Sequence, residues 1–447
     1  MPAWGRPIGR DESARLHSGT RRSGTRRPGL LHGALRNPNF RRYATGQAVS
    51  NTGTWIQRVA QDWLVLKLTH GDGTVLGITT ALQFLPLLLL GAYGGVIADR
   101  YPGRRILLTT QATLGALALT LGLLTISGTV TLGSVYALAL AVGLTLAVDQ
   151  PTQQVFIAEA VGADDLPNAL ALNSTAFNLA RMTGPALAGP VIGLFGIGPA
   201  FLLNALSYAV VLAALLRTDT ATLHTRPAAG AAGGGLRVGL RYVRDHPDLG
   251  LPLLLVAFAA GFGMNFQITT ALMATKAFHA RAGTFGLGPT ALALGAVAGS
   301  LIAAWRRPPS RHDLVAFGVA FGLLETATAL MPSYPSFLLL LLPTGATMLL
   351  LMNAAKTRLQ LGSADEMRGR VMSGYALASL GTTPLVAPFI GWLSQQSGAR
   401  AGLAVGGLVS VAAALAVGAG YRRLSGAQGR ARGWGRWPRR ASGELPG

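Results

Sequence analysis

The sequence predicts an all-α integral membrane protein with twelve transmembrane helices in two lobes of six. Half of its 447 residues are apolar and only 12% are charged, against about a quarter in soluble proteins. The apolar residues gather in segments near the ~20 residues that a helix needs to cross a bilayer. With 59 glycines and 7% aromatic residues, the composition favours closely packed helices over an aromatic-girdled β-barrel.

Twelve segments have a suitable length. They fall at residues 43–67, 74–98, 106–126, 132–157, 169–194, 199–216, 250–275, 286–305, 313–331, 335–355, 371–395 and 401–421. The first is the least apolar, but its polar residues are three or four positions apart and therefore share one helical stripe. They are Gln47, Asn51, Thr54, Arg58 and then Gln61 or Asp62. Because a charge that faces lipid costs several kcal/mol, this stripe should line a cavity.

The positions of the basic residues predict the topology. Of the 38 lysines and arginines, 10 lie in residues 1–42 and 7 follow Tyr421. Placing both termini and the even-numbered connections on one side of the membrane collects 32 of the 38 there and leaves four on the other side. The positive-inside rule then puts both termini in the cytoplasm. Bases confined to tails and junctions, without interleaved aromatics, argue against nucleic-acid binding.

The longest interior connection, residues 217–249, divides the chain into two halves with six segments each. We expect a disordered, Arg-rich cytoplasmic tail over 1–40, an N-terminal lobe over 41–217 and a cytoplasmic linker over 218–248. A C-terminal lobe should follow over 249–422, and a second disordered tail over 423–447. Tails rich in Arg, Gly, Ser and Pro cannot bury a core, which is the reason to expect disorder.

An internal repeat supports the two halves. Residues Pro190–Gly193 of the fifth segment recur as Pro388–Gly391 in the eleventh, and Gly91 and Gly95 of the second segment find Gly295 and Gly299 in the eighth. The two offsets are close to half of the predicted folded length. Parallel repeats of this kind belong to one large transporter architecture.

The connection after the second segment carries a motif of glycines, one acid and several bases. Its members are Gly95, Asp99, Arg100, Gly103, Arg104 and Arg105. Gly95 should let two helices approach, and Asp99 can accept hydrogen bonds from exposed amides at a neighbouring helix N-terminus. The motif resembles the loop 2–3 signature of the major facilitator superfamily, with one extra residue before Gly103.

Further stretches are similar to the enterobactin-exporter-like branch of that superfamily. They are residues 35–43 with Gln47, Trp55 and Trp63, residues 168–173, residues 181–189 and residues 368–372. The similarity runs from about residue 35 to residue 423. It implies the major facilitator fold of two six-helix lobes, and commonly an exporter of siderophores, macrolides or other drugs that uses the proton gradient.

The fifth segment carries a second polar stripe, formed by Ser174, Asn178 and Arg181. It ends at Gly184, Pro185 and Gly189, which resemble the glycine–proline motif of antiporters in the superfamily. Small residues at this spacing equally suit close helix packing.

Ionisable residues inside membrane segments are functional candidates. Here they are Arg58, Asp62, Asp149, Arg181 and Glu325. Arg58 and Asp62, four residues apart, either neutralise each other or take part in coupling. Asp149 is either a proton carrier or a structural partner of Arg181, and we expect these two residues to form the coupling pair. Glu325 serves either coupling or packing.

These residues predict a proton-coupled exporter with a central site between the lobes. Gln267, Asn353 and Lys356 should face that site from the C-terminal lobe. The expected partners are a small-molecule substrate, protons and the cell-membrane lipid bilayer, and the expected state is a monomer without cofactor or metal. The chain has no cysteine and no nucleophile–base set, which argues against an enzyme. An uptake symporter or facilitator, and a non-transporting membrane sensor or scaffold, are the alternatives.

Overall fold

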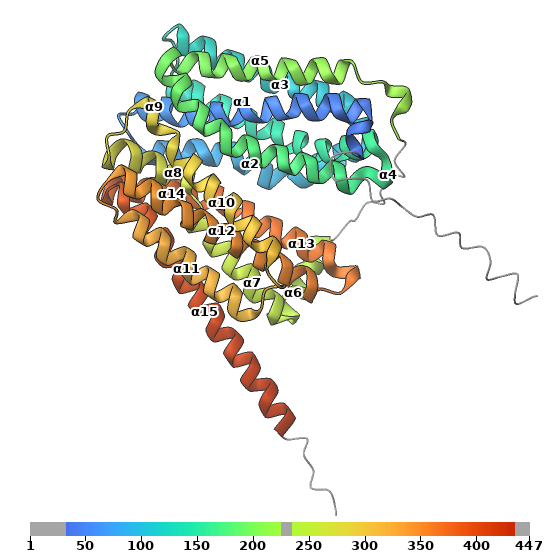
Figure 1. Ribbon diagram of the computed structural model, residues 1–447, viewed down its shortest axis with the longest axis vertical. Coiled ribbons are helices and arrows are strands. Elements are labelled where there is room, and N and C mark those ends of the chain that lie inside the picture. The colour runs from blue at the N-terminus through green and yellow to red at the C-terminus, as the bar shows by residue number, and fades with distance from the viewer. Residues whose placement is uncertain (1–32, 225–234, 434–447) are drawn as a thin grey trace, which may run out of the picture.

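The computed structural model describes residues 33–224 and 235–433, which form helices joined by short turns, with no β-strand in these two ranges. The helices make two bundles, shown in Figure 1: residues 33–224, here called the N-lobe, and residues 235–433, here called the C-lobe. The predicted fold class is confirmed.

The N-lobe contains five long helices and two short 3-10 turns. In chain order these are η1 (Ala34–Arg36), α1 (Pro38–Leu68), α2 (Gly73–Arg100), α3 (Gly103–Ile126), α4 (Leu132–Phe195), α5 (Ile197–Leu216) and η2 (Thr220–Thr222). The 64-residue α4 is two helices joined at Gly162, whose φ of 73° and ψ of −177° are not helical. Glycine adopts such a positive φ without steric penalty. The halves of α4 correspond to the predicted fourth and fifth segments.

The C-lobe has more interruptions. Its elements are α6 (Gly235–Asp245), α7 (Pro247–Phe258), η3 (Ala259–Gly263), α8 (Phe266–Leu272), η4 (Met273–Ala277), α9 (Ala282–Phe285), α10 (Leu287–Trp305), α11 (Arg311–Ala329), α12 (Tyr334–Gly362), α13 (Asp365–Leu380), α14 (Thr382–Ser397) and α15 (Ala399–Gly433). The segments η3 and η4 are π-helical. Together α7, η3, α8 and η4 make the seventh predicted segment, and α13 with α14 makes the eleventh.

Nine helical stretches in the described ranges are long and apolar enough to cross a membrane. The stretch α4 holds two crossings, and α1 and α11 add two that are less apolar, which gives the twelve that were predicted. The low hydropathy of α1 has a structural cause. Its polar side chains are buried against neighbouring helices and therefore do not face lipid; they include Gln47, Ser50, Gln61 and Asp62.

Parts of the predicted tails and linker are helical. At the start of α1, the Asn37 side chain accepts from the backbone N–H of Asn39 at 2.9 Å and donates to the carbonyl oxygen of Ala160. Such an N-cap fixes the start of a helix. At the other terminus α15 continues to Gly433, and α6 lies inside the predicted linker. Residues 1–32, 225–234 and 434–447 of the predicted tails and linker lie outside the described residues.

The two lobes meet at one end of the molecule, here called the closed end, and diverge toward the other, the linker end, where α6 and α13 lie (Figure 1). Glycines make the contacts at the closed end: Gly73 of α2 abuts Gly391 of α14, and Gly189 of α4 abuts Gly283 of α9. Without a Cβ, two backbones can approach closely. The two pairs join equivalent segments of the repeat, the second with the eleventh and the eighth with the fifth.

The helix contact predicted at Gly95 needs a correction. The close approach predicted at Gly95 is made by Gly94, where an added Cβ would overlap the carbonyl oxygen of Ala147 in α4. At Gly95 an added Cβ would meet nothing else in the described chain within 4 Å. In the C-lobe, α10 packs on α12 through Gly295 against Leu342 and Gly299 against Ala346. The close approach of α2 is therefore one residue from the predicted position, because α2 turns Gly94 toward α4.

Candidate functional site

A cavity of about 510 Å³ lies between the two lobes. Its walls come from α1, α2 and α4 of the N-lobe and from α8, α10, α12, α13 and α14 of the C-lobe. Residues from both halves of the repeat therefore share one site, as the sequence predicted. The volume is in the range of pockets that bury small organic ligands.

Four ionisable side chains line this cavity: Arg58, Asp62, Arg181 and Lys356. The guanidinium of Arg58 lies over the ring of Trp55, 4.6 Å from its centroid, and 5.5 Å from that of Phe84. This cation–π arrangement replaces the predicted neutralising pair with Asp62, since no ion pair joins Arg58 to an acid within residues 33–224 and 235–433. A planar guanidinium suits aromatic faces.

Asp62 instead bridges the lobes. Its carboxylate, in a residue only 6% exposed, accepts a hydrogen bond from Nε2 of Gln267 at 2.9 Å. Asp62 lies on α1 of the N-lobe and Gln267 on α8 of the C-lobe. The bond therefore exists only while these two helices are close together, and a change in it changes the stability of this arrangement of the lobes.

Asp149 does not reach the cavity. This residue, 1% exposed, accepts from Thr110 Oγ1 at 2.6 Å, Gln111 Nε2 at 2.9 Å and Gln153 Nε2 at 2.6 Å. Three neutral donors thus satisfy the carboxylate inside the N-lobe. The predicted pair with Arg181 is not formed, because Arg181 points into the central cavity from the second half of α4.

The remaining predicted cavity residues divide between cavity and surface. Gln267, Asn353 and Lys356 line the central cavity as expected. Ser174 and Asn178 are exposed and do not line it, and the Asn178 amide donates to the Ser174 carbonyl oxygen at 2.9 Å. The second polar stripe therefore contributes one residue, Arg181, to the site.

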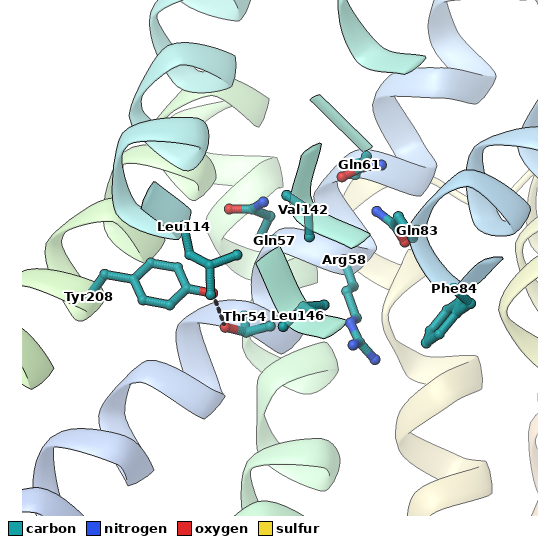
Figure 2. Close-up of a pocket in the computed structure, with 10 residues that line it drawn as sticks. All are labelled: Thr54, Gln57, Arg58, Gln61, Gln83, Phe84, Leu114, Val142, Leu146 and Tyr208. Atoms are coloured by element: carbon teal, nitrogen blue, oxygen red, sulfur yellow. Dashed lines mark hydrogen bonds between the residues drawn. The ribbon is translucent and has the colours of Figure 1, made fainter. Parts of the chain in front are cut away.

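The first polar stripe also divides. Thr54, Arg58 and Gln61 face a second, much smaller pocket of about 30 Å³ inside the N-lobe (Figure 2). Figure 2 shows Thr54 bonded to the hydroxyl of Tyr208, at 3.2 Å. Gln47 and Asn51 lie nearer the N-terminus of α1, outside both pockets, and the Gln47 amide donates to the Asn51 side-chain oxygen at 3.2 Å. Arg58 and Phe84 line both the small pocket and the central cavity.

Glu325 lies away from the cavity, in the core of the C-lobe. It is 1% exposed, and its Oε2 has no hydrogen-bond partner in the described chain. Its carboxyl oxygens are packed against Gly263 and Gly406, where an added Cβ would lie 2.8 Å and 2.9 Å from them. Of the two predicted roles, this position fits packing.

The glycine–proline motif on α4 is a packing element. An added Cβ at Gly184 would overlap the Cβ of Trp55 on α1, so Gly184 lets α4 approach the helix that carries Arg58. Pro185 abuts Gly286 and Gly189 abuts Gly283, both at the closed end of the C-lobe. The motif therefore connects cavity wall and lobe contact in one stretch of helix.

The loop motif between α2 and α3 lies at the linker end. Asp99, Arg100 and Arg105 are exposed. Arg104 donates from Nε to the carbonyl oxygen of Leu215 at 2.8 Å and from an Nη to that of Leu216 at 3.2 Å, which are the last carbonyls of α5. Cations favour such C-termini. Gly103 is buried, and an added Cβ there would lie 3.0 Å from the Glu159 carboxylate.

Several lining residues were not predicted. They are the aromatic residues Trp55, Phe84 and Tyr375 of the cavity, and Gln57, Gln83 and Tyr208 of the small pocket. Gln83 could have been found as an isolated amide in an otherwise apolar segment. The aromatic residues could not, because lipid-facing and cavity-facing rings look alike in a sequence.

Two six-helix lobes around a central cavity that holds charged side chains define a membrane transporter of the major facilitator fold. The chain belongs to the transmembrane secretion effector family of that superfamily, which it matches over residues 32–427. Family and fold are those of transporters and not of enzymes.

Two relatives illustrate the family. The chain is 25% identical to the staphyloferrin A transporter of Staphylococcus aureus over 253 residues, which are 56% of this chain and 63% of that protein. It is 26% identical to the multidrug efflux pump Tap of Mycolicibacterium fortuitum over 365 residues, 79% of this chain and 88% of the pump. The match to the first of these thus spans less than two thirds of its length.

Solved structures support the fold. A bacterial homologue of the human lysosomal transporter Spinster, in an inward-facing and occupied conformation, superposes with a TM-score of 0.69 at 14% identity, covering 87% of this chain and 97% of the other. A D-xylose–proton symporter gives a TM-score of 0.63 at 13% identity, covering 85% and 96%.

Proposed function

We propose that the protein is a proton-coupled exporter of a small organic molecule in the cell membrane, working as a single chain by alternating access. The observation that carries this proposal is the central cavity, which is closed at one end and holds a carboxylate, Asp62, bonded across the lobes. The two relatives named for siderophore transport and multidrug efflux support the same reading.

In the proposed cycle, the linker end faces the cytoplasm, and the conformation of Figure 1 receives substrate from inside the cell. Substrate binding favours separation of the lobes at the closed end, which breaks the bond between Asp62 and Gln267. After the substrate has left to the outside, Asp62 takes a proton from there. The lobes then close again at the closed end, and Asp62 releases the proton to the cytoplasm and regains its bond to Gln267. A ligand shifts such an equilibrium only through its different affinity for the two states.

The loop motif would control the opposite change. When the lobes close at the linker end, Asp99 of α2 would meet the start of α13, which carries Arg368 and Arg370. We propose that this contact stabilises the outward-facing state, since charge-assisted hydrogen bonds are worth about 1.5–3 kcal/mol.

An efflux screen tests the proposed function. Cells that lack the protein should accumulate at least one compound of a diverse panel that complemented cells exclude, and a protonophore should abolish the difference. Inverted vesicles should take up that compound when acidified inside. A compound that the deletion cells fail to take up would instead identify an uptake symporter, and no difference for any compound would favour the sensor or scaffold.

The proposed topology predicts where thiol reagents can reach. The chain has no cysteine, so single replacements give a clean signal. Asp245→Cys at the linker end should resist an impermeant maleimide in intact cells and react after permeabilisation, because both termini and the linker are cytoplasmic. Ser127→Cys, in the exposed turn after α3, should react in intact cells. The reverse labelling pattern would invert the topology and with it the direction of the cycle.

A further inference from the structure

The charges of the central cavity are unbalanced. Arg58, Arg181 and Lys356 line it, whereas Asp62 is the one carboxylate among the described lining residues. That carboxylate already accepts from Gln267, a neutral amide. Within residues 33–224 and 235–433, neither arginine forms an ion pair with an acid. With all four groups ionised, the wall therefore carries an excess of two positive charges.

Such an excess is costly inside a membrane. Cations removed from water are stable only when an anion, a polar partner or a hydrated space compensates them. Arg58 finds partial compensation on the rings of Trp55 and Phe84, whose centroids lie 4.6 Å and 5.5 Å from the guanidinium carbon. Arg181 lies within the same cavity on α4. A guanidinium presents a planar fork of donors that matches a carboxylate in two parallel hydrogen bonds.

Most of the rest of the wall is apolar or aromatic, with amides and hydroxyls such as Asn265, Asn353 and Thr383 between. Phe266, Met348 and Met352 line it along with Trp55, Phe84 and Tyr375. Aromatic and methionine side chains accept flat or flexible apolar groups. A ligand that satisfies this wall needs a sizeable apolar body as well as negative charge.

We infer that the transported substrate is an amphipathic organic carboxylate, whose acid group is held by Arg58 and Arg181 and whose apolar body lies on the aromatic wall. Lys356, exposed on α12, receives a second acid group where the substrate has one. That this carboxylate is transported rests on the proposed function, but its binding can be measured without transport.

Four naphthalene compounds of similar shape and different charge provide the test. They are 2,6-naphthalenedicarboxylate, 2-naphthoate, 2-naphthamide and 2-naphthylmethylamine. Binding to the purified full chain in lipid nanodiscs is measured by titration calorimetry. We expect affinity to fall in that order, with 2-naphthoate bound about ten- to a hundredfold more tightly than the amide, as loss of a charge-assisted pair implies.

Variants locate the site. Arg181→Gln should lower the affinity for 2-naphthoate by about tenfold or more and leave the affinity for 2-naphthamide nearly unchanged. Arg181→Lys keeps the charge but loses the planar fork of donors, so its affinity for 2-naphthoate should be intermediate. Arg281→Gln, an exposed cation that does not line the cavity, is the matched control and should bind like the parent. Thermal unfolding of each variant verifies that it is folded.

Opposite results overturn the inference. Equal or tighter binding of the amine, no binding of either acid at millimolar concentration, or unchanged 2-naphthoate affinity in a folded Arg181→Gln would each exclude an anion site. Counterflow of 2-naphthoate in proteoliposomes is measured separately. Binding without counterflow would contradict the proposed transport function but support the anion site. Active efflux of cations alone would support the transport function but contradict the anion site.

Discussion

Asp62→Asn should abolish proton-driven accumulation of substrate and retain downhill exchange. This result is expected if Asp62 couples proton movement to substrate movement. The asparagine keeps the shape and can still accept from Gln267 across the lobes, but it cannot gain or lose a proton. A hydrogen bond to a charged group is worth about 1.5–3 kcal/mol and a neutral one about 0.5–1.5. Protonation of Asp62 can thus shift the equilibrium between joined and separated lobes at the closed end by about tenfold. The variant cannot undergo this shift, because asparagine does not titrate.

Proteoliposomes separate the two activities, using the compound that the efflux screen identifies. Uphill uptake driven by an imposed pH gradient should disappear in Asp62→Asn, and counterflow without a gradient should persist. Asp164→Asn, an exposed acid outside the cavity, is the control and should retain both. Undiminished uphill transport by Asp62→Asn would remove this residue from coupling. Selective loss of uphill transport in a well-folded Asp149→Asn would place coupling inside the N-lobe, where three neutral donors surround that carboxylate.

Gly286→Ala should prevent closure at the closed end and stop transport. An added Cβ there would overlap the carbonyl oxygen of Pro185 and lie 3.4 Å from the nitrogen of Gly189, both on α4 of the other lobe. The substitution suits the backbone of Gly286, whose φ is −72°, so the effect comes from the lobe contact. Overpacking of this kind costs about 1–3 kcal/mol, which shifts the lobe populations by about 5- to 150-fold.

Gly283→Ala is a closely matched control, because an added Cβ three residues earlier meets nothing else in the described chain within 4 Å. Spin labels at Ser127→Cys and Ser333→Cys, in exposed turns of the two lobes, report their separation by pulsed electron resonance. The distance distribution should move to longer values in Gly286→Ala and stay unchanged in Gly283→Ala. Identical distributions in both variants would show that the backbone at Pro185 yields, and that this contact does not limit closure.

Hydropathy and spacing were enough for the fold. The twelve segments, their grouping in two lobes and even the weakly apolar α1 follow from patterns within single helices, which a sequence displays directly. The joining of two segments into one α4 through Gly162 does not, because it depends on a backbone angle that many glycines could adopt. The exchange of Gly95 for Gly94 has a similar origin: a difference of one residue turns a glycine by about 100° around the helix and decides which neighbour it faces.

The site was harder to predict than the fold. Sequence spacing placed Arg58, Asp62 and Arg181 on cavity-facing stripes, and they do line the cavity. Their partners were missed, because the ring of Trp55, the amide of Gln267 and the donors around Asp149 come from other turns or other helices. Opposite charges at helical spacing suggested ion pairs, whereas neutral amides, hydroxyls and aromatic rings provide the contacts.

The number of residues in the π-helical segment η3 determines which side chains of the following helix face the cavity. In η3 the backbone N–H of Met264 bonds to the carbonyl oxygen of Ala259, five residues back, so this turn holds one residue more than an α-helical turn. Deleting one residue from Ala259–Gly263 would restore α-helical spacing in this turn but rotate everything beyond it by about 100°. Gln267 would then no longer point at Asp62. A single-codon deletion here would exchange one cavity wall for another while barely altering hydropathy.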